Sequence, residues 1–121
     1  MYYYRVRHWR PVATSNDELF RILADPTRRR ILDLLADGGP RTVSELAAEF
    51  PKLVPSGISK HLMSLRAAGL VVATRRGRQQ IYLINGRALA DGLVPWLARY
   101  QQYWPDAFDR LAAQKVVQLF D

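Results

Sequence analysis

Helix-ending signals divide roughly the first 70 residues of the chain into short segments. Gly38-Gly39-Pro40, the turn at 51–55 with a proline at each end, and Gly69 each interrupt a run of apolar residues at helical spacing. The chain must therefore form several short helices that pack on one another, because an isolated short helix is marginal in water. A length of 121 residues provides for one domain with one core.

The first three segments start with residues that favour a helix N-terminus. They are Ser15 or Asn16 for the first, Asp25 followed by Pro26 for the second, and Thr42 with Glu45, a capping box, for the third. The third segment has apolar residues at i, i+3, i+4 and i+7, which predicts a helix from Val43 to Phe50. A fourth helix over about 55–68 buries one side formed by Ile58, Leu62 and Leu65.

The next part of the chain favours a β-hairpin. The segments 70–74 and 80–84 have strand composition, and 75–79 forms the loop between them. Ile81 and Leu83 are the apolar positions of the second strand. The predicted fold class is mostly α with a small two-stranded antiparallel β-hairpin, the element order of a winged helix-turn-helix, and we expect it to be dimeric.

The remainder of the chain is expected to be helical, with terminal dimerisation helices over about 87–118. Pro95 and Pro105 lie in this region, and we expect a break or kink at each because a proline inside a helix costs about 3 kcal/mol. We take 15–121 as a single domain, preceded by an N-terminal aromatic and basic arm over 1–14.

The positive charge of the chain is concentrated in one window. The formal net charge is +7, and the segment 50–90 holds seven basic residues and no acidic residue, whereas 1–49 sum to +1 and 91–121 to −1. A segment of one sign between balanced segments is typical of a surface that binds a polyanion such as double-stranded DNA. A solvated basic face without a partner is the alternative.

The predicted helix over 55–68 has a polar face suited to the major groove, where Ser, Lys and His reach base edges and phosphates. Small side chains let its backbone approach closely, at Ser56, Gly57, Ser59 and Ser64. An exposed helix face with no such role is the alternative. The basic loop at 75–79, which includes Gln79, is suited to the DNA backbone or the adjacent minor groove.

Four motifs, in order and at matching spacing, resemble the ArsR/SmtB-type transcriptional regulators, in their metal-independent subgroup. The motifs are LADPTRRRILDLL at 23–35, TVSELA at 42–47, ISKHLMSLRAAGLV at 58–71 and RGRQQIYLI at 76–84. The resemblance covers about 17–111. It implies a homodimeric DNA-binding repressor that places two recognition helices on a palindromic operator.

The resemblance also implies roles for individual residues. Contacts to bases or phosphates fall to Ser56, Ser59, Lys60, His61 and Ser64, and contacts from the wing fall to Arg75, Arg76 and Arg78. The turn at 51–55 is about one residue longer than is usual in that family and has no obvious polar N-cap other than Ser56. The start of the recognition helix is therefore open at this point.

The composition argues against a metal site and against an enzyme. The metal sites of such regulators use cysteine thiolates or clustered histidines, and this chain has no cysteine and only His8 and His61. No catalytic triad, phosphate-binding loop or carboxylate pair is recognisable. We expect a cytoplasmic protein without cofactor, metal or membrane contact, with an unidentified small organic effector as a candidate partner.

Aromatic residues outside the DNA-binding module exceed what one small core requires. Tryptophan and tyrosine are enriched at protein interfaces, which predicts dimerisation through the first and the closing helices. The candidate interface residues are Leu19, Phe20, Leu23, Leu93, Trp96, Leu97, Tyr100 and Trp104. Packing on the monomer's own core, and a ligand pocket between these helices, are the alternatives.

The first ten residues hold Tyr2-Tyr3-Tyr4, Trp9 and three arginines without helical or strand periodicity. A DNA-reaching arm, a packing segment on the dimer and a start codon placed too early are all compatible, and four aromatic residues favour packing. For the whole chain, the leading hypothesis is a sequence-specific transcriptional repressor. The alternative is a winged-helix interaction module that binds an acidic protein.

Overall fold

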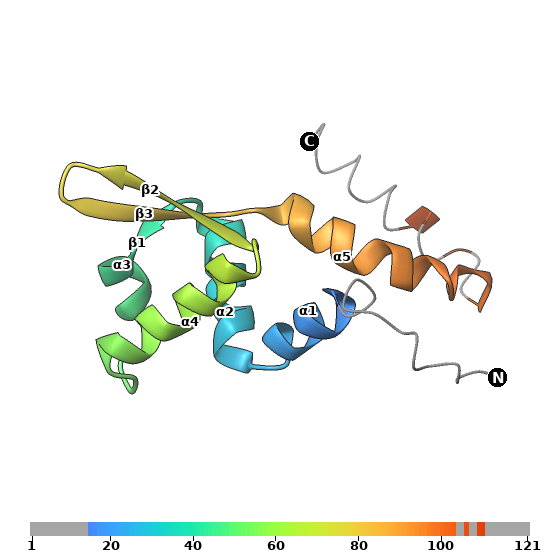
Figure 1. Cartoon of the computed structure of the whole chain (residues 1–121), viewed down its shortest axis with the longest axis horizontal. Helices are drawn as coiled ribbons and strands as arrows, with labels where there is room; N and C mark the ends of the chain where they lie inside the picture. Colours follow the sequence, from blue (N-terminus) through green and yellow to red (C-terminus); the bar gives the residue numbers. More distant parts are fainter. Residues whose placement is uncertain (1–14, 104–105, 107–108, 111–121) are drawn as a thin grey trace.

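The computed structural model describes residues 15–103, 106 and 109–110, so predictions on 1–14, Trp104 and Pro105 lie outside the described residues. The elements in chain order are α1 (Ser15–Leu23), α2 (Pro26–Gly38), β1 (Arg41–Thr42), α3 (Val43–Ala47), α4 (Pro55–Ala67), β2 (Val71–Arg76), β3 (Gln79–Ile84), α5 (Gly86–Ala98) and a 3-10 turn, Gln101–Tyr103 (Figure 1). This is the mostly α winged helix-turn-helix that the sequence predicts. Its helix-turn-helix is α3 and α4, and its wing is the hairpin of β2 and β3.

Two of the predicted helix starts are confirmed in detail. The carboxylate of Asp25 accepts hydrogen bonds from the N–H groups of Thr27, at 2.7 Å, and Arg28, at 3.2 Å, before α2. The capping box before α3 is complete, since Thr42 N–H donates to the Glu45 carboxylate at 2.8 Å and Glu45 N–H donates to Thr42 Oγ1 at 3.1 Å. These bonds satisfy backbone donors that a helix N-terminus leaves without partners.

Other helix boundaries differ from the prediction. Helix α1 begins at Ser15, so it already contains both residues expected to cap it. Helix α3 ends at Ala47 instead of Phe50, which lies half-buried against the core. The apolar spacing suggested a longer helix because Phe50 packs against the core, although the helix ends before it.

We expected a break or kink at Pro95, and the structure shows no break, because α5 runs continuously from Gly86 through Pro95 to Ala98. A proline removes one N–H donor, and in a helix its usual acceptor is the carbonyl four residues earlier, here Asp91. Because Asp91 is exposed, water can take the place of the missing donor. The helix ends before the 3-10 turn, so it covers only the first part of the region predicted as helical over 87–118.

The sheet has three strands, and the predicted hairpin supplies two of them. The strand order is β1-β3-β2, with both neighbouring pairs antiparallel. The short strand β1 pairs Arg41 with Tyr82 and Thr42 with Ile81. Two residues are too few to show strand periodicity, so the sequence did not indicate this third strand.

The strand register shows which residues of the hairpin face the helices. Ala73 pairs with Tyr82 on the face toward the helices, and Tyr82 belongs to the buried cluster. Successive residues of a strand point to opposite faces, so Ile81 and Leu83 lie on the other face. Ile81 is nevertheless buried as well, at 7% exposed, where β3 pairs with Thr42 of β1.

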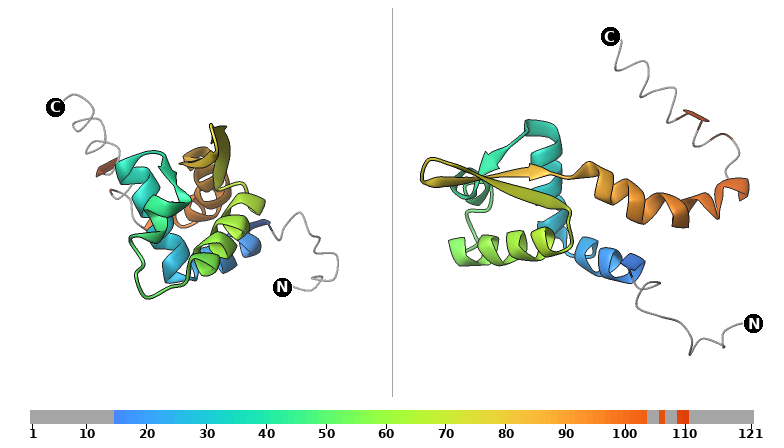
Figure 2. Two further views of the ribbon diagram at one scale, coloured as in Figure 1. Left: turned by 90° about the vertical axis from the view of Figure 1, so that its left-hand side faces the viewer. Right: turned by 45° about the horizontal axis from the view of Figure 1, so that its top comes forward.

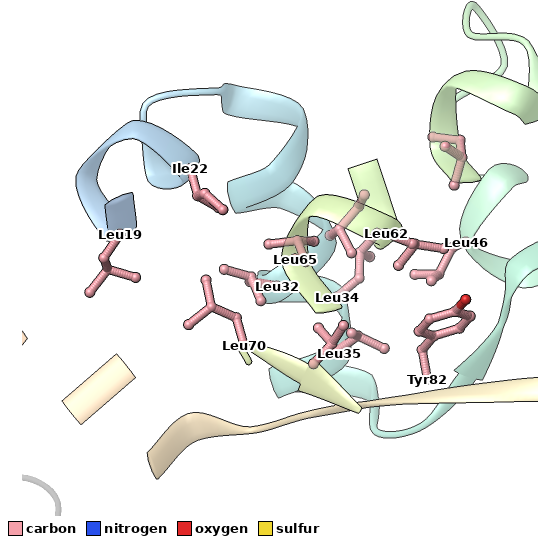
Figure 3. Packing of buried hydrophobic residues seen from close by; sticks show 13 residues of the cluster. Leu19, Ile22, Leu32, Leu34, Leu35, Leu46, Leu62, Leu65, Leu70 and Tyr82 are labelled. Carbon is pink, nitrogen blue, oxygen red and sulfur yellow. The ribbon is translucent and has the colours of Figure 1, made fainter. Parts of the chain in front are cut away.

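The core is a single cluster of mainly aliphatic side chains from α1, α2, α3, α4 and the sheet (Figure 3). The predicted buried face of α4 is confirmed, since Ile58, Leu62 and Leu65 are each 0% exposed. Removal of this much apolar surface from water is the main stabilising contribution in a small domain. The cluster fixes α4 on one side of the hairpin and leaves the rest of the helix surface free.

The cluster separates two ends of the molecule. The start of α4 and the tip of the hairpin lie at one end, and α1 and α5 lie side by side at the other (Figures 1 and 2). We call these the basic end and the aromatic end, after the side chains described below.

Candidate nucleic-acid interface

The recognition helix α4 begins at Pro55, after Val54 as the N-cap residue with no side-chain hydrogen bond. Proline suits the first helical position because its missing N–H would lack a helical partner there in any case. Ser56 is therefore not the cap and stays exposed. Its hydroxyl, together with backbone N–H groups of the first turn, lies at the N-terminal end of the helix, where the helix dipole favours an anion.

The structure divides the predicted recognition residues into two groups. Ser56, Ser59 and Lys60 are exposed, whereas Gly57, His61 and Ser64 are half-buried. Ser64 lines a groove of about 290 Å³ that also contains Arg28 of α2 and Glu18 and Arg21 of α1.

The hairpin positions the predicted wing residues at its tip. Arg75 and Arg76 are the last residues of β2, and Gln79 is the first of β3, so the loop is shorter than the predicted 75–79. The turn is possible because Gly77 has a φ of 63°, a conformation that residues with a side chain rarely adopt. Arg78 completes the turn, and all four side chains are exposed.

The basic side chains of α4 and the hairpin are not neutralised by carboxylates. Among the described residues, arginine ion pairs join Arg21 to Glu18, Arg30 to Glu49, Arg87 to Asp91 and Arg110 to Asp106. None of these pairs includes a basic residue of α4 or of the hairpin. The basic end therefore has free positive charge next to a narrow helix face, which is the arrangement that double-stranded DNA requires.

Comparison with known proteins identifies relatives of this chain. A family model described as a helix-turn-helix domain matches residues 23–73. The transcriptional repressor SdpR of Bacillus subtilis (strain 168) is 37% identical over 84 residues, which are 69% of this chain and 90% of that protein. Solved structures that are named as ArsR-family or ArsR-like regulators match it over 96% or more of their own length. The chain belongs to the ArsR family of transcriptional regulators.

Solved structures of this family share the fold. An ArsR-like transcriptional regulator from Rhodococcus sp. RHA1 is 31% identical and superposes with a TM-score of 0.62 over 89% of this chain and 96% of its own. The homodimeric winged helix-turn-helix DNA-binding domain of a possible ArsR-family regulator from Mycobacterium bovis is 33% identical, with a TM-score of 0.59 over 74% of this chain and 83% of its own. The alignment with both structures extends beyond the residues of the helix-turn-helix itself.

One contact at the basic end was not indicated by the sequence. The Arg28 guanidinium of α2 donates a hydrogen bond from Nε to Nδ1 of His61 on α4, at 3.2 Å. The two residues are 33 positions apart, and no local pattern predicts such a contact. His61 was predicted to contact DNA, and the structure shows that one of its two ring nitrogens already has a protein partner.

The carboxylate of Asp25 lies close to this pair. Burial raises the pKa of Asp25, but this effect is outweighed by the hydrogen bonds from the N–H groups of Arg28 and Thr27. Electrostatic interactions with His61, when its ring is protonated, and with the Arg28 guanidinium lower the pKa further, so that it falls below its ordinary value. Asp25 is therefore ionised at neutral pH and supplies a negative charge next to the Arg28–His61 contact.

The described residues contain no group of three or more His, Cys, Asp or Glu side chains that could hold a metal ion. Within the same part of the chain, no helix has both the length and the apolar character needed to cross a membrane.

The aromatic end exposes three rings in contact with one another. Phe20, Trp96 and Tyr100 are 37%, 38% and 39% exposed. The ring of Trp96 lies edge-on to Phe20, with centroids 5.1 Å apart, and to Tyr100, with centroids 5.2 Å apart. We call these three residues the aromatic face.

The other predicted interface residues have different surroundings. Leu19 is buried in the monomer's own cluster, and Leu23 and Leu93 pack against that cluster. Leu97 is half-buried. A core role was one of the alternatives for this region, and the structure shows such packing for these three leucines.

Proposed function

We propose that this ArsR-family protein is a homodimeric repressor that binds a palindromic operator. Helix α4 enters the major groove with Ser56, Ser59 and Lys60, and the hairpin arginines contact the adjacent backbone or minor groove. The proposal rests mainly on one observation, the free positive charge that α4 and the hairpin tip expose at the same end of the molecule. DNA binding by such a surface is driven by the release of counterions from phosphates.

The aromatic face supports the dimer in this proposal. Three adjoining aromatic rings that are each more than one-third exposed are unusual on a monomer's surface and typical of the centre of an interface. The related domain from Mycobacterium bovis is homodimeric. Two copies joined through α1 and α5 would present two copies of α4 to two half-sites, which accounts for a palindromic operator.

The decisive experiment measures sequence discrimination. The full chain is titrated at near-physiological salt against a duplex from its own upstream region and against a scrambled duplex of equal composition, with fluorescence anisotropy as the readout. We expect the upstream duplex to bind at least about 10³-fold more tightly. Equal, weak and salt-sensitive binding to both duplexes would contradict the proposal and favour the alternative, an interaction module for an acidic protein.

Two substitutions separate the roles of helix and wing. Arg78→Ala should weaken binding to both duplexes about equally and reduce the slope of log K against log salt concentration by about 1. Lys60→Ala should also lower the ratio between the two duplexes. Arg87→Ala is the matched control, because it removes an exposed arginine that is ion-paired to Asp91 on α5. An effect of Arg87→Ala equal to that of Arg78→Ala would show that only total charge matters.

The proposal includes no catalytic step and no metal ion. A small organic effector is a further prediction, for which a groove of about 330 Å³ between α1, α4 and α5 is the candidate site. Its lining is mainly small or aliphatic, with Leu19, Leu70, Ala88 and Gly92, and has the carboxylate of Glu18 at one side. An apolar compound with a positively charged group is the chemistry that such a groove would select.

A further inference from the structure

The contact between Arg28 and His61 connects the recognition helix to the helix behind it. Both residues are half-buried, and the Nε–H of Arg28 donates to His61 Nδ1 at 3.2 Å. In the described part of the chain, no other hydrogen bond joins a side chain of α4 to a side chain of another helix. The orientation of the His61 ring is thus set from α2.

This contact also determines where the ring carries its proton. A guanidinium has only donors, so the Nδ1 atom that faces it must offer a lone pair. A neutral imidazole with an unprotonated Nδ1 carries its proton on Nε2. His61 is therefore held in the Nε2–H tautomer, and the structure gives Nε2 no hydrogen-bond partner among the described residues.

We infer that Arg28 is a positioning residue that makes His61 a hydrogen-bond donor toward DNA. This inference rests on the proposed DNA binding, and it specifies the chemistry that His61 recognises. An Nε2–H group pairs with an acceptor, such as a phosphate oxygen, guanine N7 or O6, or thymine O4. The opposite tautomer would present a lone pair and would suit the amino groups of adenine or cytosine instead.

The charged groups around His61 are consistent with this state. Arg28 and Asp25 face it from α2 and its N-cap, with the ionised Asp25 carboxylate balancing the guanidinium. Lys60 is the neighbouring charged residue on α4 itself, and its side chain is exposed. Glu18 and Arg21 of α1 lie in the groove that Arg28 and Ser64 line, and they complete the set of charged groups on this side of α4.

The tautomer can be measured directly by NMR on the full chain labelled with ¹⁵N-histidine. The chain contains two histidines, so His8→Gln leaves the signals of His61 alone. The spectra are recorded about two pH units above the ordinary histidine pKa of about 6.5. We expect the His61 Nδ1 signal at its unprotonated limit and the Nε2 signal at its protonated limit. A protonated Nδ1 would overturn the inference, and this measurement does not depend on any change at Arg28.

The role of Arg28 is tested with Arg28→Gln, using Arg30→Gln as the control. Both changes remove one arginine from α2, but Arg30 lies exposed near Glu49 and away from His61. Arg28→Gln should move both His61 signals toward those of a freely exchanging imidazole and lower the ratio of upstream to scrambled duplex affinity by about fivefold, the effect of one hydrogen bond. Arg30→Gln should change neither the signals nor the ratio.

A double-mutant cycle with His61→Gln shows whether Arg28 acts through His61. If it does, Arg28→Gln has no further effect on the affinity ratio once His61 is replaced. Additive effects would indicate that Arg28 contacts DNA directly and would overturn the inference. If the unmodified protein does not discriminate between the duplexes, the proposed repressor function is wrong. If it does discriminate and Arg28→Gln leaves the affinity ratio of the two duplexes unchanged, only the present inference is wrong.

Discussion

The two ends of the molecule expose opposite kinds of side chain. The basic end exposes Lys60 and the hairpin arginines, without carboxylate partners among the described residues. The aromatic end exposes Phe20, Trp96 and Tyr100, with the ring of Trp96 edge-on to each of the other two. The buried cluster joins α1 to α2, α3, α4 and the sheet, and so connects the elements that carry the two surfaces.

This difference means that the proposed DNA contact and the proposed dimer contact would depend on different forces. Charge–phosphate contacts weaken steeply as salt concentration rises, because they depend on counterion release. Burial of aromatic surface depends little on salt, because it depends on removal of apolar area from water. Salt titration should therefore affect DNA binding and leave self-association nearly unchanged, and each end can be tested separately by substitution.

The largest expected effect is loss of the dimer through Trp96→Asp. A charge in the middle of the aromatic face would be buried without a partner, and such central aromatic residues contribute about 2 kcal/mol or more to an interface. We expect the dimer dissociation constant to rise at least about 30-fold, with a monomer detected by sedimentation velocity.

Ala90→Asp is the matched control for this change, because Ala90 is an exposed residue of the same helix. It should retain the dimer, and circular dichroism should show folded protein for both variants. A dimer that survives Trp96→Asp in a folded protein would place the subunit interface elsewhere.

A smaller effect, on the stability of the fold, is expected from a substitution at the contact between α1 and α5. A Cβ atom added at Gly92 of α5 would lie 2.6 Å from Cδ2 of Leu19 on α1, whereas one added at Gly86 would meet nothing within 4 Å. Gly86 is the first residue of α5, so its change to alanine gains less helix propensity than the change at Gly92, and a net loss of stability at Gly92 therefore reports the clash. We expect Gly92→Ala to be less stable than Gly86→Ala by about 1–2 kcal/mol in urea unfolding. Equal stabilities would mean that α1 and α5 do not pack as closely as described.

The sequence predicted the elements and the charged surface well because their signals are local. The capping box at Thr42, the Asp25 cap, the stop at Gly39 and the buried face of α4 all depend on residues within one or two turns. The concentration of positive charge in 50–90 was also evident from the sequence. Basic residues that are close along the chain stay close in space here, because the helix and the hairpin that carry them are neighbours in the fold. These features are the ones that position the proposed DNA-binding residues.

The features that the sequence missed depend on distant contacts. Strand β1 exists because Arg41 and Thr42 find β3 as a partner, and the Arg28–His61 hydrogen bond joins residues on separate helices. The continuation of α5 through Pro95 was missed for a related reason, since helix packing can outweigh a local propensity. Likewise, an apolar pattern could not separate Leu19, which packs in its own core, from Phe20, which is exposed.

The smallest expected effect concerns Asp25, at the corner between α1 and α2, and it depends on pH. Asp25→Ala removes the cap of α2 and should lower the free energy of unfolding by about 1 kcal/mol at neutral pH, whereas Asp25→Asn retains a capping oxygen and should lose less. Because the pKa of Asp25 is lowered in the folded state, its charge stabilises the fold above the unfolded pKa of about 3.9, and this contribution is lost as pH falls through the folded value. The stability difference between the unmodified protein and Asp25→Asn should therefore shrink below about pH 4 in urea unfolding. A stability difference between the two proteins that stays constant from neutral pH to acid would show that the carboxylate acts only as a hydrogen-bond acceptor. Its charge would then not stabilise the corner between α1 and α2.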